Sequence, residues 1–261
     1  MDNFRQRIEG LDLSLFDKVH SQTSPNDKRS FLAIEAATGE LTDGFTYLEI
    51  GSYLGGSLQP YVADGRCGRI FSIDLRPKES ADDRGVSQIY HDNTTARMLE
   101  NLRGVDGADL SKLTCIDADV KDIDPSRIDP APELCLIDGE HTDEATWRDY
   151  KFCREVMASN GAIVFHDAMI IYNCLDRIVT ELASEGVKFR AYNLPDVVFV
   201  VEIGDFPLHR SQSITDMLTN NHVGYLHSLK FTDQYRRFAN RWPFTAIRQV
   251  KARFTGSNVT K

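Results

Sequence analysis

The sequence predicts an α/β fold: a seven-stranded, mostly parallel sheet with helices on both faces and an antiparallel closing strand. Short apolar runs alternate with helical stretches from about residue 30 to about residue 203. This alternation is typical of a parallel sheet that is covered by helices. In addition, the turn Asn193–Asp196 separates the last two runs, which favours an antiparallel pair at the end of the sheet.

Seven short runs are the predicted strands. Five of them are rich in apolar or β-branched residues, as expected of strands buried on both faces, and they are residues 46–50, 69–73, 112–116, 133–137 and 162–165. The closing pair is expected at residues 187–192 and 197–202. Helical spacing of apolar residues predicts helices over 143–158 and 173–184, because Gly161 and Gly186 follow them as stop signals.

The composition is that of a globular protein, because 261 residues with 41% hydrophobic content can bury one sizeable core. The net charge of −9 argues against a nucleic-acid partner, since phosphate recognition needs a basic face. No stretch approaches the roughly 18 apolar residues of a membrane helix, and the N-terminus lacks the apolar run of a signal peptide. Five widely spaced cysteines fit reduced thiols. We therefore expect a cytoplasmic protein without an integral membrane segment.

Three regions follow from this pattern. Residues 1–30 are expected to be an N-terminal helical addition, 31–204 the sheet domain, and 205–261 a C-terminal helical and aromatic tail. The tail contains the basic and aromatic stretches Tyr235–Phe238 and Arg241–Phe244. Such a segment can rest on a membrane surface, contact a partner subunit or pack on the domain, and we favour packing or a homo-oligomer contact.

Glycines follow the first predicted strand at positions 51, 55 and 56. Glycine permits a sharp turn and lets a ligand approach the backbone closely, although a tight turn without function gives the same pattern. The next strand ends at Asp74, about 20 residues downstream, where a Rossmann-like domain binds ribose hydroxyls. Together these features favour an adenosine-type ligand.

Acidic and histidine side chains end two later strands. Asp138 and His141 follow one of them, and His166 and Asp167 follow the next. Neighbouring parallel strands end at the same crevice, so we expect these side chains to converge. Two carboxylates and an imidazole suit Mg²⁺ or Mn²⁺. The alternative is structural: Asp138 binds backbone amides, His141 caps a helix and His166 lies in the core.

Three motifs now resemble a known family. Residues 48–57, LEIGSYLGGS, resemble the first motif of class I S-adenosylmethionine-dependent methyltransferases of the catechol O-methyltransferase type. The pair IDGEH at 137–141 and IVFHD at 163–167 resembles small O-methyltransferases often found with sugar and polysaccharide genes, and the related cephalosporin hydroxylase-like proteins. The resemblance covers roughly residues 30–203.

This resemblance implies a cofactor site. Around the methionine part of S-adenosylmethionine it places Glu49, Gly51, Ser52, Gly55, Ser57 and Asp138. It also implies that Asp74 binds the ribose and that Asp119 contacts the adenine.

The resemblance further implies a catalytic site with a divalent ion. Asp138 and Asp167 match metal-binding aspartates, His166 matches a further metal ligand of some relatives, and His141 matches a general base. Ala168 departs from the catechol type, which has an asparagine there, so a third ligand has to come from His166 or another donor. Some relatives use a histidine base without metal.

The expected activity is therefore metal-assisted O-methylation of a hydroxyl on a small molecule, sugar or glycan. A nicotinamide-dependent oxidoreductase is an alternative, but it predicts GxGxxG, whereas this sequence spaces its glycines as GxxxGG. A second alternative is an inactive module of the same fold that serves in assembly. The presence of Glu49, Asp74, Asp138 and Asp167 argues against such decay.

Overall fold

The computed structural model describes residues 3–77, 79–81, 87–219, 237–238, 241–247 and 250. The chain divides into two compact units, Met1–Leu218 and Thr219–Lys261. In the described part of the second unit, the rings of Phe238 and Phe244 lie 5.3 Å apart. Tyr235 and Arg236 of the predicted aromatic tail lie outside the described residues.

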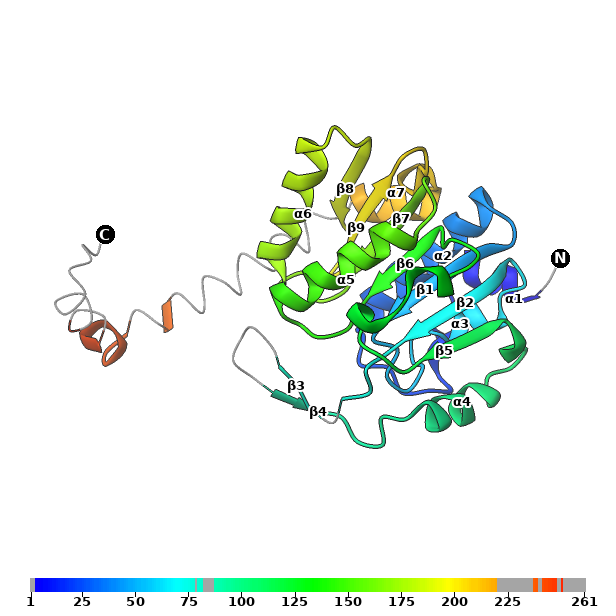
Figure 1. Ribbon diagram of the computed structural model, residues 1–261, viewed down its shortest axis with the longest axis horizontal. Coiled ribbons are helices and arrows are strands. Elements are labelled where there is room, and N and C mark those ends of the chain that lie inside the picture. Colours follow the sequence, from blue (N-terminus) through cyan, green and yellow to red (C-terminus); the bar gives the residue numbers. More distant parts are fainter. Residues whose placement is uncertain are drawn as a thin grey trace. The chain divides into compact units, whose positions relative to one another are not determined.

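A seven-stranded sheet forms the centre of the first unit, in the order β5-β2-β1-β6-β7-β9-β8 (Figure 1). The strands are β1 (Phe45–Ile50), β2 (Cys67–Ile73), β5 (Leu113–Ile116), β6 (Leu134–Ile137), β7 (Gly161–Phe165), β8 (Phe189–Asn193) and β9 (Phe199–Ile203). The first five run parallel, and β9 runs antiparallel between β7 and β8. The predicted mostly parallel sheet with an antiparallel closing strand is confirmed.

Seven α-helices are described: α1 (Asn3–Glu9), α2 (Pro25–Leu41), α3 (Gln59–Ala63), α4 (Thr95–Arg103), α5 (Asp143–Val156), α6 (Tyr172–Ser184) and α7 (Gln212–Thr219). Five 3₁₀ turns lie at Leu13–Phe16, Leu110–Lys112, Val120–Asp122, Pro125–Arg127 and Leu208–Arg210. Side-chain caps begin the main helices. The Ser24 hydroxyl and the Asp27 carboxylate form a capping box at α2, and Thr142 caps α5. No helix in the described ranges is long and apolar enough to cross a membrane.

Side chains alternate between the two faces of the sheet, and each face has its own core. Tyr47 of β1 belongs to the core beneath α2, α3 and α4, whereas Leu48 belongs to the core beneath α5 and α6. Ile8 and Phe16 of the N-terminal region join the first core. Helices therefore cover both faces, as predicted.

The strand and helix bounds generally lie within two residues of the predicted ones, but two local features differ. The antiparallel hairpin β3 (Glu79–Ala81) and β4 (Ser87–Ile89) forms a separate two-stranded sheet that is not among the seven predicted strands (Figure 1). The helix that follows the glycines, α3, begins at Gln59 and has five residues, because turns occupy the glycine-containing segment before it.

Candidate active site

The five parallel strands end in one row across the sheet. Ile50 of β1 pairs with Ile73 of β2 and Ile137 of β6. The row continues from β2 to Ile116 of β5 and from β6 to Phe165 of β7. The next residue of each strand therefore lies at the same edge of the sheet. These residues are Gly51, Asp74, Asp117, Asp138 and His166.

Backbone hydrogen bonds hold this row of residues in place. The N–H groups of Gly51, Asp138 and His166 each donate to the last carbonyl of a neighbouring strand, at 2.8, 2.9 and 3.1 Å. The N–H of Asp74 does the same at 3.1 Å. The sheet ladder thus positions four residues that the sequence singled out, with no help from their side chains.

Gly51 has to be glycine. Its φ is +95°, and a Cβ there would lie 2.1 Å from the carbonyl oxygen of Asp138. Both the left-handed backbone and the close approach exclude a side chain. The first turn after β1 therefore packs directly against the loop after β6.

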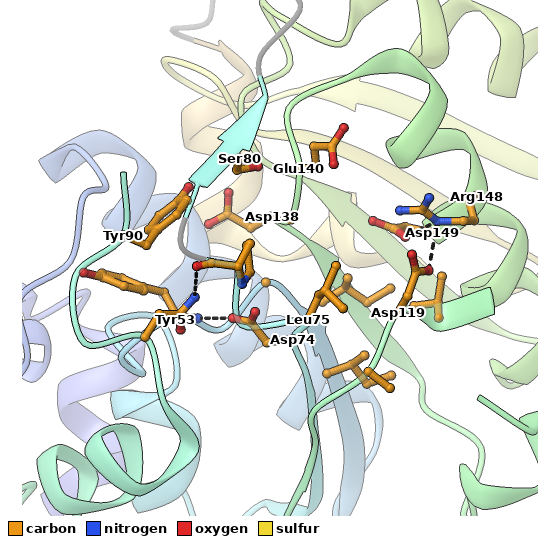
Figure 2. A pocket seen from close by; sticks show the side chains of 18 of the residues that line it. Tyr53, Asp74, Leu75, Ser80, Tyr90, Asp119, Asp138, Glu140, Arg148 and Asp149 are labelled. Atoms are coloured by element: carbon orange, nitrogen blue, oxygen red, sulfur yellow. Dashed lines mark hydrogen bonds and ion pairs between the residues drawn. The ribbon is translucent and has the colours of Figure 1, made fainter. Parts of the chain in front are cut away.

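A first cavity lies above β1, β2, β5 and β6. Figure 2 shows Tyr53, Asp74 and Tyr90 at one end, and Asp119, Arg148 and Asp149 at the other. Further lining residues are Ile50, Gly51, Ile73, Leu75, Pro77, Glu79, Ser80, Asn93, Ala118, Val120, Asp138, Gly139 and Glu140. The cavity joins polar ends through an apolar middle, which is the usual construction of a small-molecule site.

Asp74 lies at one end of this cavity and is 6% exposed. Its carboxylate accepts hydrogen bonds from the N–H groups of Tyr53 (2.8 Å) and Arg76 (2.6 Å). The Arg76 guanidinium lies 3.4 Å away. Asp74 is therefore fixed before any ligand binds.

The opposite end of the first cavity carries Asp119. Its carboxylate pairs with Arg148 Nε at 3.2 Å and Lys121 Nζ at 3.3 Å. The neighbouring Asp149 is 4% exposed, and this burial raises the pKa of its carboxyl to about 7 despite the opposing charge of Arg148. The expected adenine contact thus lies in the cavity, beside two charged residues that the sequence did not single out.

A second cavity adjoins the first. It is lined by His20, Ser21, Gln22, Thr23, Gly51, Ser52, Tyr53, Gly56, Ser57, Tyr90, Asp138, His141, His166 and Asp167. Gly51, Tyr53, Tyr90 and Asp138 line both cavities. The two spaces therefore meet where the turn after β1 faces the end of β6. Residues 20–23 bring the N-terminal region, predicted only as a helical addition, to this site.

Four titratable side chains converge in the second cavity. His166 Nδ1 lies 3.0 Å from Asp138 Oδ1 and 3.3 Å from Asp167 Oδ2. His141 Nε2 lies 3.1 Å from Asp167 Oδ2 and 3.7 Å from Asp138 Oδ1. The predicted convergence of the strand ends is present in the structure.

Opposite charges shift the pKa values in this cluster. Burial acts to lower the pKa of His141, but the hydrogen bond and charge of Asp138 and the charge of Asp167 raise it above its usual value. Burial likewise opposes the charge of His166, yet the surrounding carboxylates raise its pKa well above the usual range. Burial acts to raise the pKa of Asp138, and the two histidines lower it well below its usual range.

Asp27 of α2 faces the other side of His166. Its Oδ2 lies 3.5 Å from His166 Nε2, an atom with no hydrogen-bond partner in the described part of the chain. Asp27 Oδ1 accepts a hydrogen bond from the N–H of Val197 at 3.2 Å. This contact could not be predicted from the sequence, because residues 27 and 166 are far apart in the chain and Asp27 already has a role in the capping box of α2.

Glu49 lies beneath the glycine turn, fully buried. Its two oxygens accept hydrogen bonds from the hydroxyls of Ser57 and Tyr47, both at 2.6 Å. Burial raises the pKa of Glu49 to about 7, while these two hydrogen bonds lower it. Glu49 lines neither cavity, whereas Ser52 and Ser57 line the second.

The donor set of the second cavity fits a divalent cation. One ligand atom each of Asp138, His141 and Asp167 lies within 4.8 Å of the others. His166 Nδ1 faces the same two aspartates. Carboxylate oxygens with imidazole nitrogens suit Mg²⁺ or Mn²⁺. This cluster contains His141, whereas the predicted metal set was Asp138, His166 and Asp167, which stays a prediction.

The open α/β sheet with its ligand-sized cavity at the strand ends defines a class of protein: the Rossmann-like methyltransferase fold. In solved structures, the chain resembles the O-methyltransferase NovP, with a TM-score of 0.55, 14% identity, and coverage of 71% of this chain and 82% of that chain. It also resembles cofactor-bound Rv0187 from MTB, with a TM-score of 0.50 and 11% identity. The match covers 78% of this chain and 90% of that chain. At these identities the likeness shows the fold.

Residues 48–168 match the family model described as a methyltransferase domain. The matched residues include Glu49, Gly51, Asp74, Asp138 and Asp167. No curated protein matches the chain in sequence. The resemblance to class I S-adenosylmethionine-dependent methyltransferases is confirmed.

Proposed function

We propose that this chain transfers the methyl group of S-adenosylmethionine to a hydroxyl of a small molecule, with a sugar or glycan as the favoured acceptor. The observation that carries the proposal is the meeting of the two cavities at Gly51, Tyr53, Tyr90 and Asp138. Methyl transfer needs the acceptor oxygen, the methyl carbon and the sulfur in line. Two adjoining cavities allow a donor and an acceptor to meet in that way.

The first cavity suits the cofactor. Asp74 has a buried carboxylate that is fixed by two backbone N–H groups and can accept from ribose hydroxyls. Asp119 at the opposite end suits the adenine, and the methionine part would lie at the junction, beside Gly51 and Asp138. Glu49 supports this turn from below through its hydrogen bond with Ser57.

The second cavity suits a hydroxyl-rich acceptor. Each of its lining residues is a glycine or carries a polar group, including the hydroxyls of Ser21, Thr23 and Ser52. A flat apolar acceptor would displace water from these polar groups without forming hydrogen bonds to them, which costs binding energy. Hydroxyls of a sugar would pair with them.

His141 is the proposed general base. Its imidazole lies in the second cavity beside Asp138 and Asp167, whose charges stabilise the imidazolium that forms when it takes the acceptor proton. Asp138 and Asp167, with His166 or His141 as a further ligand, would hold a divalent ion. When bound, such an ion lowers the pKa of a coordinated hydroxyl.

Calorimetric titration with S-adenosylmethionine and S-adenosylhomocysteine tests the proposal. We expect micromolar binding that Asp74→Ala weakens at least about tenfold, since the ribose loses a charged acceptor. Adding Mn²⁺ should release further heat in the wild-type chain and less in Asp167→Ala. Absence of binding by either ligand would overturn the proposed function. Cofactor binding without any response to Mn²⁺ would overturn the divalent ion, and His141 would then act as a general base without metal.

A further inference from the structure

Arg76 is a buried cation that the proposed mechanism does not use. It follows Asp74 by two residues beyond β2, and its side chain is 8% exposed. Its φ is +57°, a left-handed conformation that residues with a side chain seldom adopt. Such a conformation persists only where surrounding contacts hold it.

The guanidinium of Arg76 connects its own loop, after β2, to three other loops around the first cavity. Nη1 donates to the carbonyl oxygen of Tyr53 in the turn after β1, and it lies 3.4 Å from Asp74 Oδ2 after β2. The same nitrogen donates to Asn93 Oδ1 at 3.3 Å, in the loop that precedes α4. Nε donates to Asp117 Oδ1 at 3.3 Å, after β5.

These contacts place Arg76 behind the cavity wall. Tyr53, Asp74 and Asn93 line the first cavity, while Arg76 does not. Three of these contacts go to Nη1 and the fourth to Nε, so they need two separate nitrogens of the guanidinium, which the single ammonium group of a lysine does not supply. Any effect of Arg76 on a ligand therefore has to pass through the residues that it holds.

We propose that Arg76 is a positioning residue for the cofactor, because it locks Tyr53 and Asp74 in the arrangement that receives the ribose. This role rests on the proposed function of the first cavity. The guanidinium also compensates the charge of the buried Asp74 carboxylate, so the wall stays in one arrangement in the unliganded protein.

The test is the affinity of the full-length chain for S-adenosylhomocysteine, measured by calorimetry. We expect Arg76→Met to raise the Kd about 10- to 100-fold, as is typical for lost hydrogen bonds to charged groups. Arg76→Lys should recover little of this loss, because it keeps the charge but not the fork. The matched control is Arg97→Met on α4, whose side chain is 52% exposed and pairs with Glu100. It should leave the Kd unchanged.

A double-mutant cycle separates positioning from a general loss of structure. If Arg76 acts through Asp74, then Arg76→Met should weaken binding by less than threefold in an Asp74→Asn background. Additive effects would overturn the positioning role, and so would Arg76 variants that bind like the wild type. No binding by the wild-type chain would overturn the proposed function, and this role with it.

An exposed partner of Arg76 allows a milder substitution that should not disturb folding. Asp117→Asn removes the charge that Nε contacts, at a side chain that is 51% exposed and outside both cavities. We expect a two- to fivefold rise in the Kd for S-adenosylhomocysteine if Arg76 fixes the wall. An unchanged Kd in both Asp117→Asn and Arg76→Lys would contradict the proposal.

Discussion

The two cavities differ in how their charged groups are satisfied. In the first cavity, Asp74 and Asp119 already have partners from the protein: backbone N–H groups, Arg76, Lys121 and Arg148. In the second, the side-chain partners of Asp138 and Asp167 within the described residues are the imidazoles of His141 and His166. The first is thus preorganised for a ligand of fixed shape, whereas the second holds negative charge that a proton or cation can balance.

The largest expected effect comes from removing both carboxylates of the titratable cluster in the second cavity. The double variant Asp138→Ala, Asp167→Ala should lower methyl transfer at least about 100-fold, because it removes the charges that support both the base and a divalent ion. S-adenosylhomocysteine release with a panel of sugars as acceptors measures the loss.

The single variant Asp167→Ala is the control for this comparison. Asp167 lines the second cavity and not the first, so its loss should leave the Kd for S-adenosylhomocysteine within about threefold. Full activity of the double variant would exclude the metal-assisted step. A large loss of cofactor affinity in Asp167→Ala would show that the two cavities do not act separately.

The next effect concerns the junction of the cavities. Gly51→Ala should destabilise the fold by about 2–4 kcal/mol, because its Cβ would lie 2.1 Å from the Asp138 carbonyl oxygen. Gly44→Ala is a matched control, since Gly44 also has a positive φ, +75°, but has no atom within 4 Å of an added Cβ. It should cost about 1 kcal/mol. Urea denaturation measures both, and equal losses would refute the claim of close contact.

The smallest effect concerns Glu49, beneath the junction. The pKa of Glu49 is raised to about 7 in the folded chain, compared with about 4.5 in the unfolded chain. The folded state therefore binds a proton more tightly, and the stability that this proton contributes is fully present below about pH 4.5. Stability is then lost as pH rises through 7, and this group contributes a loss of about 2 kcal/mol between pH 5 and pH 7. Glu49→Gln should flatten the pH dependence of the free energy of unfolding by that amount. An unchanged slope would show that Glu49 is ionised when buried.

The central sheet could be predicted from the sequence because each parallel strand is a short apolar run whose end is marked by glycine or a charged residue. Gly51, Asp74 and Asp138 stand directly after such runs, and the structure places all three at one edge of the sheet. The hairpin β3–β4 could not be predicted in the same way. It pairs only with itself, so its residues carry no pattern of burial against the main core.

Other parts of the candidate site depend on contacts between distant segments. Asp27 meets His166 only because α2 packs beside β7, and Arg76 has no local pattern that marks it as the link between three loops. The sequence placed Glu49 around the cofactor, and the structure shows its oxygens turned toward Ser57 and Tyr47. That assignment stays a prediction, since Glu49 can act on a ligand only through the turn above it.

The aligned strand ends also determine how long a ligand the first cavity can hold. Neighbouring strands lie about 4.8 Å apart, and three such spacings, about 14 Å, separate β5 from β6 in the order β5-β2-β1-β6. Asp119 follows the first of these strands and Asp138 the last. The first cavity extends along these strand ends, from Tyr53 and Asp74 to Asp119, so its length favours an elongated ligand over a compact one. The width of the sheet thus favours ligands of a certain length, independently of the side chains that recognise their chemical groups.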